Sequence, residues 1–157
     1  MTLASLLSPD RVIPDLEATD HWPTIVELVE HLVEGNHFPE HAKDDLLVAL
    51  RNREDQRSTG IGGGIAIPHC FSDAIDEVVT IFGRSEAGVD FSAVDRALVH
   101  YIVLFIVPAQ QHGTHLKTLA AIAKILNSAE VRNQLSEAEN SAEIMEVLGS
   151  PAAAAGD

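Results

Sequence analysis

The segment Ser58–Cys70 reads STGIGGGIAIPHC and joins four glycines, a short apolar run and a proline that directly precedes a histidine. Glycine permits backbone conformations in which successive amide N–H groups point into one concavity, an arrangement that favours an anion. The spacing fits neither the P-loop nor the GxGxxG dinucleotide fingerprint. Residues 65–67 predict a short strand, and Pro68 is expected to stop its ladder pairing. His69 is therefore predicted to lie where a strand leaves the sheet, a place where functional residues are common.

An imidazole at that place is a candidate nucleophile toward phosphorus. Neutral histidine has a ring lone pair near pH 7 and forms a labile phosphoramidate. The added charge of about −2 then needs hydrogen-bond donors and cations nearby. The candidate donors are the backbone amides of Gly60, Gly62, Gly63 and Gly64. The alternative is a tight glycine turn beside a hydrogen-bonded core histidine, and the spacing by itself favours that alternative.

The composition narrows the classes of partner. The 157 residues include 24 acidic and 10 basic side chains, which gives a net charge of −14. Such a charge repels phosphate backbones and anionic lipid surfaces, so we expect no nucleic-acid partner and no direct membrane insertion. A single cysteine, Cys70, excludes an internal disulfide framework and suits a reducing cytosol. The most apolar run, 97–107, is too short to span a bilayer, and the N-terminus lacks the features of a signal peptide. These features predict a cytoplasmic location.

Hydrophobic periodicity predicts helices and strands on both sides of the glycine segment. Apolar spacing of three and four residues indicates helices, and β-branched runs indicate strands. The run 99–107 is apolar on both faces and is predicted to be central in its sheet. The expected helices cover 20–34, 40–57, 112–126, 131–135 and 141–148, and the expected strands cover 12–13, 65–67, 78–82 and 99–107. This order predicts an α/β sandwich with a mixed sheet, formed by a single domain over 1–150 and followed by a flexible tail, 151–157.

Three runs carry a resemblance to a known family. Arg53-Glu54, Ser58-Thr59-Gly60-Ile61-Gly62 and Gly64-Ile65-Ala66-Ile67-Pro68-His69 resemble the active-site signature of phosphotransferase-system enzyme IIA domains of the fructose/mannitol type. The resemblance extends from Leu6-Leu7-Ser8-Pro9 to the helical C-terminus. Cys70 departs from the glycine that most often follows the histidine in that family. The resemblance implies a three-layer α/β/α sandwich with a mixed sheet and one EIIA type-2 domain.

The resemblance also implies a function. His69 would accept a phosphoryl group from a histidine of a small phosphocarrier protein, and would pass it to an enzyme IIB or hold it as a signal. A second histidine is expected in a segment that Pro108 and His115-Leu116-Lys117-Thr118-Leu119 fit, so His115 would stabilise the phosphoryl group. Arg53 would bind phosphate oxygens through its two-pronged guanidinium. Thr59 would donate its hydroxyl to the phosphoryl group or would set the turn. No cofactor is implied.

Two roles remain open within this family. One is a sugar-uptake component, and the other is a stand-alone regulator similar to the nitrogen-related enzyme IIA, which the single short domain favours. The rival from another class is a non-catalytic interaction module, because the fold resembles cytoplasmic domains of anion exchangers in which no histidine is phosphorylated. The joint presence of His69, His115 and Arg53 argues against that module.

The remaining histidines and the cysteine suggest no second site. His112 and His115 are three residues apart on a helix, but no acidic ligand at fixed spacing joins them, so we expect no metal. Cys70 and His69 are expected to point to opposite faces of a strand. His100 is predicted to be a hydrogen-bonded core histidine. Four others are predicted to face solvent: His21, His31, His37 and His41.

Overall fold

The apolar run that is predicted to be central forms the middle strand of the sheet. The computed structural model describes residues 3–111 and 113–150, and β6 (Val99–Pro108) is buried along nearly its whole length. β5 (Val79–Val89) pairs with one side of β6 in the antiparallel sense. β3 (Ile65–Ala66) and β4 (His69–Ser72) pair with the other side in the parallel sense. The edges are β1 (Val12–Ile13) beside β5 and β2 (Gly60–Gly62) beside β3, so the sheet is mixed as predicted.

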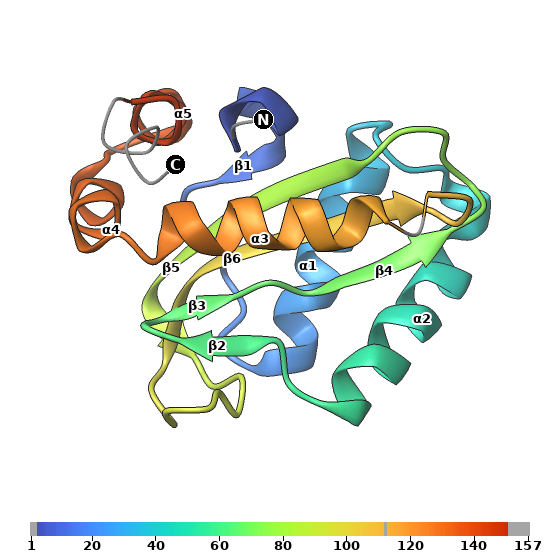
Figure 1. Ribbon diagram of the computed structural model, residues 1–157, viewed down its shortest axis with the longest axis horizontal. Helices are drawn as coiled ribbons and strands as arrows, with labels where there is room; N and C mark the ends of the chain where they lie inside the picture. The colour runs from blue at the N-terminus through green and yellow to red at the C-terminus, as the bar shows by residue number, and fades with distance from the viewer. Residues whose placement is uncertain (1–2, 112, 151–157) are drawn as a thin grey trace.

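Helices cover both faces of this sheet. α3 runs across one face, with α4 and α5 beyond its end, and α1 and α2 lie on the other face (Figure 1). Their bounds are α1 His21–Glu34, α2 Lys43–Gln56, α3 Thr114–Leu126, α4 Ala129–Glu137 and α5 Ser141–Leu148. Short 3₁₀ turns occupy η1 Ala4–Leu6, η2 Pro9–Arg11 and η3 Glu40–Ala42. The predicted three-layer α/β/α sandwich is confirmed.

The alternation of side chains along β6 explains why its sequence has no polar face. Val103 and Phe105 pack with Ile122 of α3 in one core. Leu104 and Ile106 pack in a second core with the apolar faces of α1 and α2. Because successive side chains of a strand point to opposite sides, a strand between two helical layers is apolar at every position.

The segment around Pro68 differs from the sequence-based expectation. The chain was expected to leave the sheet there, but β4 begins at His69 and pairs with β6 at Phe105, in the same register that joins Ile65 to Tyr101. Pro68 lacks an N–H, yet its carbonyl accepts the Phe105 N–H at 3.0 Å, so the ladder is interrupted and then resumes. His69 is therefore fixed by strand pairing immediately after the interruption.

The sequence also predicts that no segment spans a membrane and that the end of the chain is a flexible tail. Over residues 3–111 and 113–150, none of the helices combines the length and the apolar character that crossing a bilayer requires. The predicted flexible tail, 151–157, lies outside the described residues.

Candidate functional site

His69 is held by its backbone and by an aromatic neighbour. Its ring stacks on Phe105, with ring centroids 4.9 Å apart and planes within 6°. Nδ1 lies 2.8 Å from the carbonyl oxygen of Ile67. Because a carbonyl oxygen only accepts, Nδ1 carries the proton, and the lone pair of the neutral ring is on Nε2. The half-buried imidazole thus has a defined tautomer and a defined nucleophilic atom.

The surroundings of His69 favour its neutral form. Burial lowers the pKa of the His69 imidazole below its ordinary value of 6.5, and this effect outweighs the hydrogen bond to Ile67, which raises it. The positive charge of Arg53 and the neighbouring His115 also lower the pKa, while Glu54 raises it. At neutral pH the ring is therefore uncharged and able to act as a nucleophile.

The structure brings His115 and Arg53 to His69. The two imidazole rings lie 6.3 Å apart between centroids, and the His115 ring also meets the edge of Phe71. A surface cavity of about 400 Å³ contains His69, His115 and Arg53 in its lining. His115 is in the first turn of α3, and Arg53 is in the last turn of α2. Two helices on opposite faces of the sheet thus place a second imidazole and a guanidinium beside His69.

Thr59 and Gly60 line a second cavity that also contains His69, with a volume of about 340 Å³. The Thr59 hydroxyl donates to Glu54, and the Gly60 amide donates to Ser58 Oγ at 3.1 Å. Gly60 approaches Ala93 so closely that a Cβ would lie 2.8 Å from the Ala93 Cβ. These contacts favour the view that both residues shape the wall of the cavity.

The other three glycines lie apart from His69. Gly62, Gly63 and Gly64 have φ angles between 67° and 95° and connect β2 to β3. The Gly63 amide donates to Asp95 Oδ2 at 3.1 Å, and none of the three lines a described cavity that contains His69. The run Gly62–Gly64 thus forms a hairpin turn, and the cradle of amides around His69 stays a prediction.

A buried carboxylate next to the site was missed as a functional candidate. Glu54 is only 8% exposed and lies within hydrogen-bond distance of His21 Nε2 at 2.9 Å and of the Thr59 amide at 3.2 Å. His21, which was predicted to face solvent, is half-buried in this contact. His31 and His37 are also only partly exposed, and each hydrogen-bonds to Asp10 near the surface. The sequence signal is the Arg53-Glu54 pair, in which the family resemblance assigns a role to Arg53 alone.

Cys70 contributes to the lining of the cavity that holds His69, but the residue itself is buried. Its side chain lies in the core on the α1–α2 side, opposite His69, as the strand alternation predicts. Burial raises the pKa of the Cys70 thiol to about 12, so the thiolate is not formed near neutral pH. Among the residues that the structure describes, no three His, Cys, Asp or Glu side chains gather to hold a metal ion. His112, which was considered with His115, lies outside the described residues.

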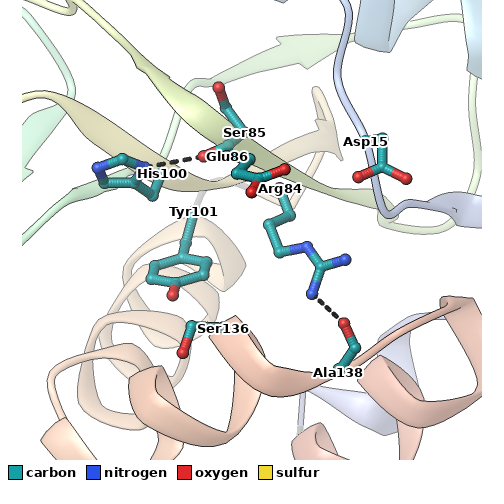
Figure 2. A pocket seen from close by; sticks show the side chains of 8 residues that line it. All are labelled: Asp15, Arg84, Ser85, Glu86, His100, Tyr101, Ser136 and Ala138. Carbon is teal, nitrogen blue, oxygen red and sulfur yellow. Dashed lines mark hydrogen bonds between the residues drawn. The ribbon is translucent and has the colours of Figure 1, made fainter.

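A cavity of about 480 Å³ at the start of β6 contains none of the predicted site residues (Figure 2). Arg84 lines this cavity, and its guanidinium donates hydrogen bonds to the backbone carbonyls of Pro14, Leu135 and Ala138. His100 donates from Nδ1 to the Ser85 carbonyl at 2.8 Å, so its prediction as a hydrogen-bonded histidine is confirmed. Arg84 therefore ties the loop after β1 and the link between α4 and α5 to β5.

Known proteins resemble this chain over nearly its full length. The family model described as "Phosphoenolpyruvate-dependent sugar phosphotransferase system, EIIA 2" matches residues 5–150. The fructose-specific EIIA component of Haloferax volcanii is 38% identical over 106 residues, which cover 68% of this chain and 69% of that protein. A nitrogen regulatory protein of Bradyrhizobium diazoefficiens is 28% identical over 99% of both chains. The chain spans 23% of the fructose-specific EIIABC component of Bacillus subtilis, to which it is 31% identical.

Solved structures show the same fold. The nitrogen regulatory protein IIA-Ntr of Neisseria meningitidis superimposes with a TM-score of 0.83 at 26% identity, covering 93% of this chain and 98% of that one. The mannitol enzyme IIA of Escherichia coli, solved in complex with phosphorylated mannitol enzyme IIB, has a TM-score of 0.75 at 18% identity and covers 91% and 96%. With the family model matched from residue 5 to residue 150 and the fold shared, the chain belongs to the EIIA 2 family of the phosphoenolpyruvate-dependent sugar phosphotransferase system, whose members take part in phosphoryl transfer.

Proposed function

We propose that this protein carries a phosphoryl group on Nε2 of His69, which it accepts from a phosphohistidine of a small phosphocarrier protein. The observation that carries the proposal is the hydrogen bond from Nδ1 to the Ile67 carbonyl, which leaves the lone pair on Nε2. In the transfer, the bond between phosphorus and the donor nitrogen breaks as the bond to Nε2 forms. The Nδ1 proton stays in place, so the product is a neutral ring bearing a phosphoryl group of charge about −2.

Arg53 and His115 are the groups that we assign to stabilise this charge. Both share a cavity with His69. A guanidinium binds two phosphoryl oxygens at once, and the first turn of α3 carries the positive end of the helix dipole. The amides of Gly60 and Gly63 already donate to Ser58 and Asp95, which makes the side chains the main donors.

Exposed apolar side chains around His69 support a docking surface for the protein partners. Ile61 and Val94 line the same cavity as His69 and are 42% and 73% exposed, and Leu116, next to His115, is 62% exposed. Apolar side chains grouped at the rim of a site mark contact surfaces for other proteins. The mannitol enzyme IIA that shares this fold was solved with phosphorylated enzyme IIB, which supports a partner of the IIB class.

The test of the proposal is intact mass spectrometry after incubation with phosphoenolpyruvate, enzyme I and a phosphocarrier. We expect one phosphoryl adduct that is lost on acid treatment, because phosphorus–nitrogen bonds of histidine are acid-labile. A competent relay that leaves the mass unchanged would favour the non-catalytic interaction module instead.

Within this function we infer a regulatory role of the nitrogen-related type. The support is the correspondence with a nitrogen regulatory protein over 99% of both chains and the TM-score of 0.83 with IIA-Ntr. The second candidate, transfer to a sugar-specific enzyme IIB, is supported by the 38% identity to a fructose-specific EIIA component. Incubating the phosphorylated protein with a fructose-type IIB domain separates the two, because only the uptake role predicts rapid loss of the phosphoryl group to that domain.

The acceptance of the phosphoryl group is expected to depend on pH through His69. Burial lowers the pKa of its imidazole, so a proton blocks Nε2 only at a pH below the ordinary value of 6.5. We expect the acceptance rate to be flat from about pH 8 to about pH 6.5 and to fall under more acidic conditions.

The measurement is an NMR titration of the His69 ring alongside the transfer rate, with the denatured chain as the control. The midpoint in the folded protein should lie below that of the denatured chain. Since the unfolded chain then binds more protons in this window, the free energy of unfolding should rise with pH between the two midpoints. A folded-state midpoint above 6.5 would contradict the assignment of burial as the dominant effect.

A further inference from the structure

A second layer of interactions beneath the site starts from the carboxylate of Glu54. This side chain follows Arg53 in the last turn of α2 and is only 4% exposed. The Thr59 hydroxyl donates to Oε1 and the Thr59 amide donates to Oε2, and His21 Nε2 lies 2.9 Å from the same Oε2. A buried carboxylate is costly unless its oxygens accept several hydrogen bonds, and here three donors surround it. The local structure is thus built to hold a negative charge at this point.

The same interactions lead from Glu54 to the reactive ring. Glu54 fixes Thr59, and the Thr59 carbonyl accepts the Ile67 N–H at 3.1 Å. The Ile67 carbonyl in turn accepts the proton on Nδ1 of His69 at 2.8 Å. The Thr59–Ile67 bond continues the pairing of Gly60 with Ala66 between β2 and β3, so anchoring of Thr59 by Glu54 helps to fix where the Ile67 carbonyl lies. Glu54 therefore positions the group that sets the tautomer of His69.

The Glu54 carboxylate accepts from Thr59, which lines a cavity together with His69, so the charge of Glu54 also acts on the His69 ring. Three charged or titratable neighbours influence the ring: Arg53 and Glu54 from α2 and His115 from α3. Arg53 and His115 oppose a positive charge on the ring, and Glu54 favours one. Phosphorylation places a charge of about −2 where the ring was neutral, so the effect of each charge reverses: Arg53 attracts the product and Glu54 repels it.

We propose that Glu54 is a positioning residue that orients His69 through Thr59 and Ile67 and, by its negative charge, keeps the phosphoryl group on His69 transferable. The proposal rests on the phosphoryl-carrier function assigned to His69 above. In the exchange, the phosphorus–nitrogen bond of the donor histidine breaks as the bond to Nε2 forms. The equilibrium constant of this exchange depends on how well each of the two proteins stabilises the phosphoryl group. A carrier must bind its cargo weakly enough to release it, and repulsion from a fixed carboxylate supplies that property.

The test replaces Glu54 with glutamine, which removes the charge and keeps the shape. A carboxamide can accept from the Thr59 amide and donate to the Thr59 hydroxyl, so we expect Glu54→Gln to fold. Equilibrated with a phosphocarrier, its equilibrium constant should shift about fivefold toward the phosphorylated protein, as loss of one screened repulsion requires. By NMR, the pKa of the His69 ring should fall relative to the wild type, because a neighbour that favours the imidazolium has been lost.

Matched variants separate charge from structure. Asp55→Asn removes one negative charge from the adjacent, exposed position and is expected to leave both readouts near the wild type. Glu54→Asp keeps the charge and should retain the wild-type equilibrium constant, although the shorter side chain slows transfer. A merely structural role for Glu54 predicts slower transfer and lower melting temperature with an unchanged equilibrium constant and an unchanged His69 pKa, and this result would overturn the proposal.

The outcomes also distinguish this proposal from the function on which it rests. If the wild-type protein gains no acid-labile adduct with a competent relay, the carrier function fails, and the carrier role of Glu54 fails with it. If the wild type is phosphorylated but Glu54→Gln behaves as Asp55→Asn does, only the role of Glu54 is wrong. Should melting show that Glu54→Gln is unfolded, Glu54→Asp decides the question, because a shifted equilibrium constant with the charge retained would contradict the proposal.

Discussion

Replacement of His69 by alanine is expected to abolish phosphorylation of this protein by the phosphoenolpyruvate-dependent relay. The neutral Nε2 of His69 is the nucleophile of the proposed transfer, and alanine supplies no atom that forms a bond to phosphorus. We expect the acceptance rate to fall by more than about 10³-fold, to the detection limit. Intact mass spectrometry before and after acid treatment measures this directly.

The controls for this prediction address folding and site identity. His69→Gln retains a side chain that can donate to the Ile67 carbonyl, and it should melt near the wild-type temperature while remaining unphosphorylated. His41→Ala removes an exposed histidine of η3 and should be phosphorylated normally. An acid-labile adduct that persists in folded His69→Gln would place the acceptor elsewhere, with His115 as the first position to examine.

Replacement of His115 by alanine is expected to slow phosphoryl transfer by about 10²-fold without abolishing it, the order that a positioned hydrogen-bond donor contributes. The His115 ring lies beside the His69 ring, with 6.3 Å between centroids, and both line one cavity with Arg53. A phosphoryl group on Nε2 would enter that cavity, where a ring N–H stabilises its oxygens as charge moves between the two proteins. Rapid-quench measurement of the adduct over time gives the rate.

The design of this second test separates transfer from docking. Under saturating phosphocarrier, loss of stabilisation in the transition state lowers the maximal rate, whereas a docking defect raises the concentration needed for half-maximal rate. Leu116→Ala, which removes an exposed apolar side chain next to His115, serves as the docking comparison. A His115→Ala variant with an unchanged maximal rate would show that the second histidine acts in docking only.

The elements of the fold were largely accessible from local sequence patterns. The helix expected over 20–34 is α1, His21–Glu34, and the run expected to form the central strand over 99–107 is β6, Val99–Pro108. Helical spacing and uninterrupted apolar runs predict such elements well, because the pattern of buried positions lies within one continuous segment. The strand expected over 78–82 extends to Val89, because Gly83, Arg84 and Val89 pair with β6 across an irregularity in the register, although the sequence GRSEAG gives little strand signal.

In the candidate site, too, some residues were identifiable from sequence motifs and others only from the structure. His69, His115 and Arg53 came from the resemblance of short motifs to a family, and the structure brings the three together. The expected glycine cradle stays a prediction, and within it the amide of Gly63 donates to Asp95, a residue 32 positions away. Glu54 was passed over because its significance depends on His21, which is 33 positions away in the sequence.

The sequence by itself thus determined the helices, the central strand, the acidic character of the chain and the candidate histidine, since each follows from composition, periodicity or a contiguous motif. Only the tertiary structure decided that β4 resumes after Pro68, that Nε2 of His69 carries the lone pair and that Glu54 is a buried charge beneath the site. These features depend on strand register and on hydrogen bonds between segments that are distant in the sequence. The free energy of such a contact depends on both partners, and a local sequence pattern contains only one of them.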